Sequence, residues 1–208
     1  MSIALERPVP TYPAPGESST YEVTYDEFMA MPVTKQHVEV VDGVIYVMAG
    51  PTIYHQVAQD RFGDELRPAV RRADLGLVVS APLDVVICER PKLRVRQPDL
   101  AYFSNARAGC RVSERLDLIQ DGILKPSLVV DVLSPGQNER TLADKLADYA
   151  SIEVEEVWFA DQETRSIRVL AREGDRYRLA GEFRPGERLV SAVLPGIDLD
   201  VAAIFGIS

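Results

Sequence analysis

The stretch Ser127–Gly136 has the sequence S-L-V-V-D-V-L-S-P-G and places one acidic residue, Asp131, inside an apolar run. Leucine and valine precede and follow Asp131 at both odd and even positions, so both faces of the run are apolar. This pattern predicts a β-strand over residues 127–133 that is buried on both sides. An ionised carboxylate is costly there unless a cation or hydrogen-bond donors compensate it. We therefore expect a positive group close to Asp131.

The next segment, residues 138–150, predicts a helix with a lysine on its apolar side. An apolar stripe runs from Leu142 to Tyr149 at helical spacing, and Lys145 lies within it. Asp144 and Asp148 are expected to project from the opposite side. A lysine in such a stripe either extends its ammonium group to solvent or pairs with the buried acid of the preceding strand. Lysine is also the less common base here, since most of the 23 basic residues are arginines.

A second acid lies in the predicted strand Gln97–Phe103, where Asp99 shares a face with apolar side chains. Pro98 precedes it and is tolerated as the first residue of a strand. Asp99 therefore either caps a turn where the strand begins or belongs to a polar site.

A third acid lies in the predicted β-hairpin Val38–Met48, whose Asp42-Gly43 pair is typical of a two-residue turn. In this register Glu39 lies opposite Tyr46, on a face that also carries apolar residues. Glu39 is either an edge-strand charge that opposes aggregation or a further member of the polar site.

The length and composition bound the fold and exclude several classes of protein. A chain of 208 residues with 46% apolar residues suits one domain, so we expect a flexible arm over residues 1–20 and a single domain over residues 21–208. The sequence has no apolar run of membrane length and no secretion signal, and its two cysteines have no metal-ligand spacing. We therefore expect a cytoplasmic protein that contacts no membrane. The net charge of −9 argues against broad, non-specific nucleic-acid binding but leaves room for a local basic cleft.

The order of the predicted elements indicates an α/β (α+β) fold, in which helices flank a mixed β-sheet. The N-terminal hairpin precedes a long helix over residues 52–72, which we expect Pro68 to kink or divide. A C-terminal antiparallel meander is expected over residues 154–182. The other predicted elements are helices at 25–31 and 200–205 and strands near 76–80, 83–88 and 94–103.

Asp99, Asp131 and Lys145, with Glu39, form a coherent group if the sheet brings their strands together. Carboxylate oxygens and a main-chain carbonyl suit a hard divalent cation, Mg²⁺ or Mn²⁺. Two histidines are too few for a zinc site built on several imidazoles. A cation held by acids beside a lysine suits phosphodiester hydrolysis, because the cation polarises the phosphoryl group and the lysine orients water or neutralises charge.

These residues resemble a known motif. Pro98-Asp99 and Asp131-Val132-Leu133 are similar to the two halves of the PD-(D/E)XK motif, which marks a nuclease superfamily with a restriction-endonuclease-like fold. Leu133 stands where the motif lysine normally does, and Lys145 matches the position to which several branches move that lysine. Within the superfamily the chain resembles the Uma-two family of uncharacterised bacterial proteins. Further matching segments are Thr24–Phe28, Val38–Gly43, His55-Gln56, Asp144–Tyr149 and Leu194–Gly196.

The resemblance implies a metal site and a catalytic lysine. Asp99 and Asp131 would bind Mg²⁺ or Mn²⁺ together with the main-chain carbonyl of Val132, and Lys145 would be the catalytic lysine. The family usually has glutamate at the position of Asp131, and the shorter side chain moves the carboxylate by roughly one methylene.

The resemblance also implies accessory residues near this site. Glu39 would be an accessory acid and Gln56 a helper at the start of the long helix. His55 either approaches the site as well or is a structural hydrogen-bonding residue.

Three functions remain open at this point. The first is a metal-dependent endonuclease that acts on nucleic acid, with DNA as the expected substrate and a homodimer as the expected assembly, since homodimers are common in this fold. The second is a non-catalytic dimeric binding or regulatory module, which the acidic net charge and Leu133 favour. The third is a glycosidase with a carboxylate pair. Trp158, the single tryptophan, lies in a predicted strand and suits a core better than a sugar platform.

Overall fold

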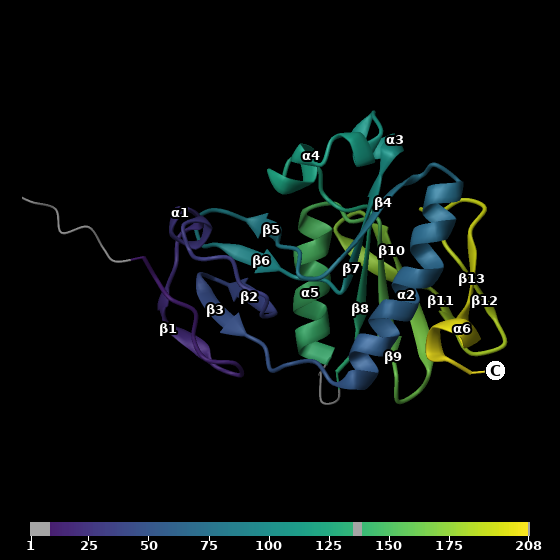
Figure 1. Cartoon of the computed structure of the whole chain (residues 1–208), viewed down its shortest axis with the longest axis horizontal. Coiled ribbons are helices and arrows are strands. Elements are labelled where there is room, and N and C mark those ends of the chain that lie inside the picture. The colour runs from purple at the N-terminus through teal and green to yellow at the C-terminus, as the bar shows by residue number, and fades with distance from the viewer. Residues whose placement is uncertain (1–8, 135–138, 208) are drawn as a thin grey trace, which may run out of the picture. The chain divides into compact units, whose positions relative to one another are not determined.

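The computed structural model describes residues 9–134 and 139–207, and the chain forms two compact units (Figure 1). The first unit comprises Met1–Gly50 and Val86–Gln97, and the second comprises Pro51–Val85 and Pro98–Ser208. Strand β1 begins at Ser18, inside the range expected to be an arm, and the first eight residues of that range lie outside the described residues. In the described part of the chain, no helix combines the length and apolarity needed to span a membrane.

The first unit contains a five-stranded sheet in the order β1-β3-β2-β6-β5 and the short helix α1. Its buried side chains include Val40, Ile45 and Val95, which pack into one hydrophobic cluster. Strand β5 belongs to this sheet, although its first residue, Val85, is also the last residue of the segment Pro51–Val85 of the second unit. The elements are β1 (Ser18–Glu22), α1 (Tyr25–Met29), β2 (Val38–Val41), β3 (Val44–Val47), β5 (Val85–Cys88) and β6 (Arg94–Arg96).

The expected hairpin and its register are confirmed. Asp42 and Gly43 both have positive φ, which a two-residue turn of this kind requires, and Glu39 pairs with Tyr46 across β2 and β3. The short helix α1 also begins as its sequence indicates, because the Thr24 and Glu27 side chains form a capping box.

The second unit is built on a six-stranded mixed sheet in the order β11-β10-β9-β8-β7-β4. Strands β8 and β9 are parallel, whereas the other four neighbouring pairs of this sheet are antiparallel, including the expected meander β9-β10-β11. The strands are β4 (Gly76–Ser80), β7 (Leu100–Ser104), β8 (Leu128–Val132), β9 (Glu156–Asp161), β10 (Ser166–Glu173) and β11 (Arg176–Phe183).

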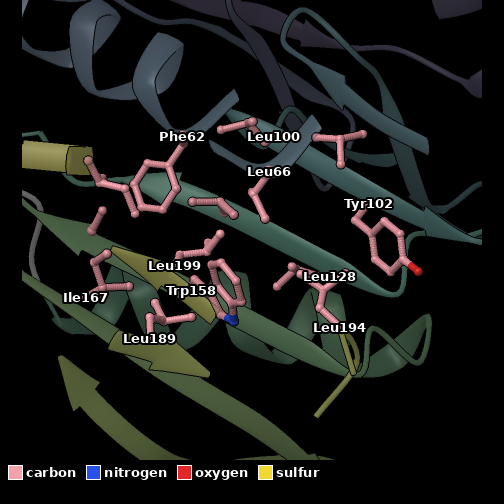
Figure 2. Packing of buried hydrophobic residues seen from close by; sticks show 14 of the residues in the cluster. Phe62, Leu66, Leu100, Tyr102, Leu128, Trp158, Ile167, Leu189, Leu194 and Leu199 are labelled. Atoms are coloured by element: carbon pink, nitrogen blue, oxygen red, sulfur yellow. The ribbon is translucent and has the colours of Figure 1, made fainter. Parts of the chain in front are cut away.

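Helices α2 (Ile53–Arg72) and α5 (Glu139–Ser151) cover opposite faces of this sheet. Phe62 and Leu66 of α2 belong to the same buried cluster as Val130, Val132 and Trp158 (Figure 2). Since side chains alternate along a strand, the residue between the two valines of β8 points to the other face, where α5 lies. The fully buried tryptophan therefore has the core role that its position predicts.

The smaller elements of the second unit lie mainly in the connections between strands and near the C-terminus. Of these elements, only the last helix matches one that the sequence predicts. They are α3 (Asn105–Ala108), the 3-10 helix η1 (Val112–Glu114), α4 (Asp117–Gln120), β12 (Arg188–Val190), β13 (Asp198–Asp200) and α6 (Val201–Phe205).

Two expectations about the elements need correction, the first in full and the second in one of its alternatives. The strand expected over 94–103 is two strands in different sheets, β6 and β7, because the chain bends at Gln97–Asp99. The expected division of the long helix at Pro68 is also wrong, because α2 runs through this residue, whereas the alternative of a kink there stays a prediction. This proline is exposed on the surface of the helix, where the hydrogen bond that it removes costs less than in a core.

Candidate functional site

The sheet of the second unit brings Asp99 and Asp131 to neighbouring positions on adjacent strands. Strands β7 and β8 pair Leu100 with Val130 and Ala101 with Val129, so the next step of this register sets Asp99 beside Asp131. Both side chains are almost fully buried, with 4% of Asp99 and 3% of Asp131 exposed. Two acids from distant parts of the sequence thus occupy the same end of the strand pair.

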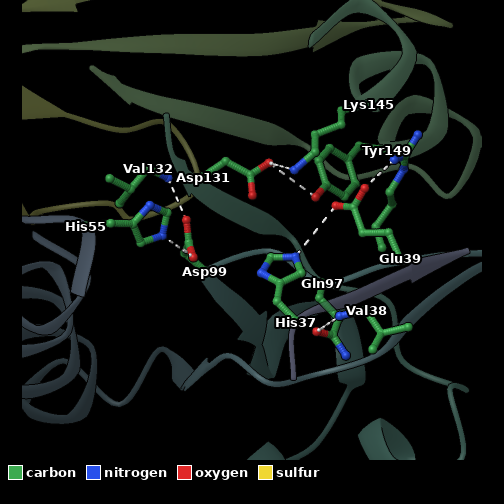
Figure 3. A network of polar contacts seen from close by, with 11 residues as sticks. His37, Val38, Glu39, His55, Gln97, Asp99, Asp131, Val132, Lys145 and Tyr149 are labelled. Carbon is green, nitrogen blue, oxygen red and sulfur yellow. Dashed lines mark hydrogen bonds and ion pairs between the residues drawn. The ribbon is translucent and has the colours of Figure 1, made fainter. Parts of the chain in front are cut away.

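Hydrogen bonds fix Asp99 at this end, and Figure 3 shows the two that its carboxylate makes with His55 and Val132. Its Oδ2 atom accepts the main-chain N–H of Val132 at 2.7 Å, and its Oδ1 atom lies 2.8 Å from Nε2 of His55 on helix α2. Its own main-chain carbonyl accepts the Gln59 side chain at 3.0 Å. Asp99 is therefore a bend residue that ties α2 to strand β8, and its position before β7 agrees with the capping alternative as well as with a polar site.

Asp131 meets the positive group that its burial requires. Lys145 of α5 places Nζ 3.4 Å from Asp131 Oδ2, and only 5% of Lys145 is exposed. The Tyr149 hydroxyl, one turn further along α5, donates to the same oxygen at 3.3 Å. Figure 3 shows both side chains converging on the carboxylate. The lysine therefore pairs with the buried acid and does not extend to solvent.

The pKa of His55 depends on the charges of Asp99, Asp131 and Lys145. The hydrogen bond to Asp99 raises the pKa of His55, and the negative charges of Asp99 and Asp131 raise it further. Burial and the Lys145 ammonium oppose this effect, but the net direction is upward. The four charged side chains thus act on one another within a single buried site.

In metal-free protein we expect NMR titration to give His55 a pKa above that of an ordinary histidine. The Asp99→Asn variant should lower this pKa, because it removes the main cause of the shift. The sign follows from linkage: a raised folded-state pKa contributes stability below the ordinary pKa of histidine, and this stability is lost as pH rises through the folded-state value. An unchanged His55 titration in Asp99→Asn would contradict the assigned interaction.

Several residues of this site give no clear signal in the sequence. Gln56 is exposed, whereas Gln59, one turn further along α2, contacts the Asp99 main chain. Tyr149 is predicted only as an apolar stripe residue. Asp148, expected to project from the side opposite the stripe, is almost fully buried, with 4% of it exposed. Asp148 follows Lys145 by three positions, and residues at this spacing are neighbours on a helix surface. The sequence could therefore have indicated that Asp148 lies beside Lys145.

Glu39 belongs to the first unit, where it forms a buried ion pair. Its Oε2 atom accepts from Arg96 Nη1 at 2.6 Å, and Oε1 lies 3.8 Å from Nε2 of His37. The Gln97 side chain accepts the main-chain N–H of Val38 at 2.9 Å beside them. The alternative of a bare edge-strand charge is wrong, because β2 is an interior strand between β3 and β6.

The donor chemistry of the Asp99–Asp131 pair suits a hard divalent cation. Across residues 9–134 and 139–207, no group of three or more His, Cys, Asp or Glu side chains is arranged to hold a metal ion. Mg²⁺, however, is commonly bound through one or two carboxylates together with water and substrate phosphate oxygens. His55 also keeps Nδ1 buried without a hydrogen-bond partner among the described residues, which leaves a polar atom at the site for a further group. The pair therefore fits the two-carboxylate mode of binding.

Comparisons with known proteins agree with this fold and identify a family. Residues 25–202 match the model of the Uma2 family, which is described as "Putative restriction endonuclease". A search of curated proteins found no match. Among solved structures, a protein from Anabaena variabilis described as a "putative nuclease belonging to DUF820" aligns with a TM-score of 0.67 and 17% sequence identity. The alignment covers 88% of this chain and 98% of that one, and at this identity it establishes a shared fold.

Proposed function

The chain belongs to the Uma2 family, and from that premise we propose that it is an endonuclease that hydrolyses phosphodiester bonds of DNA with Mg²⁺ or Mn²⁺ as its cofactor. The observation that carries the proposal is the convergence of Asp99, Asp131 and Lys145 at one end of β7 and β8. These residues come from three separate parts of the sequence, and the ion pair of 3.4 Å between Lys145 and Asp131 joins two of the elements.

Asp99 and Asp131 are the proposed metal ligands, and the main-chain carbonyl of Val132 is the proposed third oxygen. When bound, the cation would polarise the phosphoryl group and lower the pKa of a water molecule. The contacts of Asp99 support a ligand role, because the Val132 N–H and His55 hold both of its oxygens in fixed directions.

Lys145 is the proposed catalytic residue that orients the attacking water or neutralises the charge that develops on the phosphoryl oxygens. A cation that is already in place at a buried site stabilises the transition state without reorganisation during the reaction. Asp131 and helix α5 hold the ammonium group in this position, and Tyr149 supports the carboxylate with a second donor.

Plasmid cleavage with and without divalent metal tests this function. We expect cleavage with Mg²⁺ or Mn²⁺, none in EDTA, and a large loss of activity in Asp131→Asn, because the amide is a far weaker metal ligand than the carboxylate. Asp144→Asn is the matched control, since Asp144 is an exposed acid on the same helix as Lys145. Equal metal-dependent cleavage by Asp131→Asn and wild type would refute the proposal.

A non-catalytic dimeric binding or regulatory module that keeps the nuclease fold is the second candidate, and one observation favours it. Within the described residues, no cluster of three or more ligand-type side chains forms a metal site. Calorimetric titration with Mn²⁺ separates the candidates: stoichiometric binding that Asp99→Ala and Asp131→Ala abolish supports the endonuclease, and absence of binding by wild type supports the module.

The roles of Glu39 as accessory acid and Gln56 as helper stay predictions, as does the homodimer. Glu39→Gln and Gln56→Ala in the plasmid assay test the two roles through a loss of activity. Sedimentation velocity of the purified chain tests the assembly, and a monomer at assay concentration would exclude the homodimer.

A further inference from the structure

A cavity of about 770 Å³ lies in the second unit beside the carboxylate site, and the two share His55. The N-terminus of α2, the end of β8, the β9–β10 turn and α6 form its walls. Its volume lies in the range of sites that hold small organic ligands, which is too small for a duplex and sufficient for one nucleotide. Its apolar side is lined by residues such as Val57, Ile204 and Phe205.

Two arginines of this cavity, Arg61 and Arg165, form no ion pair with any residue in the described ranges, although Asp161 and Glu163 line the same cavity. The Asp161 carboxylate instead accepts two main-chain N–H groups of its own turn, at 2.8 and 3.2 Å. Most other arginines of the second unit, by contrast, contact an acid. Guanidinium groups that form no ion pair can bind an anionic ligand, and the planar guanidinium fork suits the oxygens of a phosphate group.

The position of Arg61 is built into the fold. A Cβ atom at Gly206 would collide with the Arg61 guanidinium, so the glycine that ends α6 allows the guanidinium to lie against the main chain there. The C-terminal end of a helix attracts a cation. The Arg61 side chain thus lies against the main chain at Gly206 and forms no ion pair in the described ranges. Its charge is therefore available to a ligand.

An exposed aromatic ring stands at the mouth of the cavity. Tyr54 is 76% exposed, and its main-chain carbonyl accepts the Gln162 side chain at 2.9 Å, which ties the first turn of α2 to the β9–β10 turn. Such a ring offers a stacking surface to a nucleobase. The first main-chain N–H groups of the 20-residue helix α2 have no acceptor within the helix and add positive potential at the same place.

We propose that this cavity binds one unstacked nucleotide of the substrate next to the bond that is cleaved, with its phosphate on Arg61 and Arg165 and its base against Tyr54. This inference rests on the proposed nuclease function. Because a paired base must be extruded before it can enter, the cavity favours single-stranded or unpaired nucleic acid over duplex.

Binding of a fluorescein-labelled thymidine oligonucleotide to the full chain in EDTA tests the inference without any cleavage. We expect wild type to bind the single strand at least about tenfold more tightly than the matching duplex. Arg61→Ala, Arg165→Ala and Tyr54→Ala should each weaken single-strand binding by about tenfold. Each arginine variant should also lower the slope of log affinity against log salt by about 0.7.

Two further variants separate the cavity from general charge. Val57→Trp keeps every charge but fills the cavity, so it should abolish the preference for single strands. Arg176→Ala is the matched control, because this exposed arginine lies at the β10–β11 turn outside the cavity lining. Thermal melting of each variant shows whether the fold persists, and the exposed Arg165→Glu variant provides a second test if Arg61→Ala unfolds.

The inference is overturned if the duplex binds as tightly as the single strand, or if the cavity variants bind like Arg176→Ala. It is also overturned if free thymidine monophosphate displaces the oligonucleotide at equal concentration, since the site would then belong to a free nucleotide. Loss of plasmid cleavage alone does not bear on it. If the cavity variants lose binding while wild type never cleaves, the nucleotide site stands and the nuclease function falls. If wild type cleaves plasmid while the cavity variants bind like wild type, the nucleotide site falls and the nuclease function stands.

Discussion

Lys145→Met is expected to lower the rate of plasmid cleavage by about a hundred- to a thousandfold, the usual effect of removing one charge-stabilising group from a transition state. Methionine keeps the length and much of the volume of lysine but removes the ammonium group 3.4 Å from Asp131. Binding of Mn²⁺ should persist, because both carboxylates remain. A combined measurement of cleavage rate and calorimetric metal affinity therefore separates a catalytic lysine from one that only organises the ligands.

Two controls sharpen this result. Arg140→Met removes an exposed base from the same helix and should leave cleavage unchanged. Lys145→Arg keeps the positive charge, but the planar guanidinium cannot replace a compact ammonium in a buried site, so we expect only partial activity. Wild-type activity in Lys145→Met would remove the lysine from the mechanism.

Lys145→Ala is expected to destabilise the protein by about 3–5 kcal/mol, because it leaves the Asp131 carboxylate buried without its cation. Both partners are almost completely buried, so solvent offers little compensation. The double variant Lys145→Met with Asp131→Leu should recover most of this loss, since replacing both charges with apolar groups is often neutral or stabilising. Urea denaturation gives the free energy of unfolding of each variant.

The comparison between the single and double variants decides this prediction. If the double variant is no more stable than Lys145→Ala, the cost comes from lost packing and not from an unpaired charge. The Tyr149 hydroxyl loses its acceptor in the double variant, so Tyr149→Phe added as a third change should restore a further part of the stability.

The charged residues of the candidate site could be predicted from the sequence, but their contacts and their uncharged neighbours could not. A charged residue inside an apolar strand or stripe is a strong local signal, and Asp131 and Lys145 both carry it. Tyr149 and Gln59 give no such signal, because a tyrosine in an apolar stripe and a glutamine on a helix fit ordinary packing and solvent exposure equally well. Only their partners reveal their role.

The sequence alone determined the elements whose causes are local. Alternating apolar residues with Asp42-Gly43 specify the hairpin, Thr24 and Glu27 specify the start of α1, and the apolar periodicity places α5. These features depend on neighbours within a few positions, which is why a linear pattern contains them.

The tertiary structure alone decided the features that depend on which strands pair. The segment 94–103 has uniform strand character, yet it divides between two sheets because the chain bends at Asp99. The register of β7 against β8 then sets this acid beside Asp131, and the parallel pairing of β8 with β9 carries α5 to the opposite face from α2. Pairing energies between distant segments fix these outcomes, so no pattern within one segment could specify them.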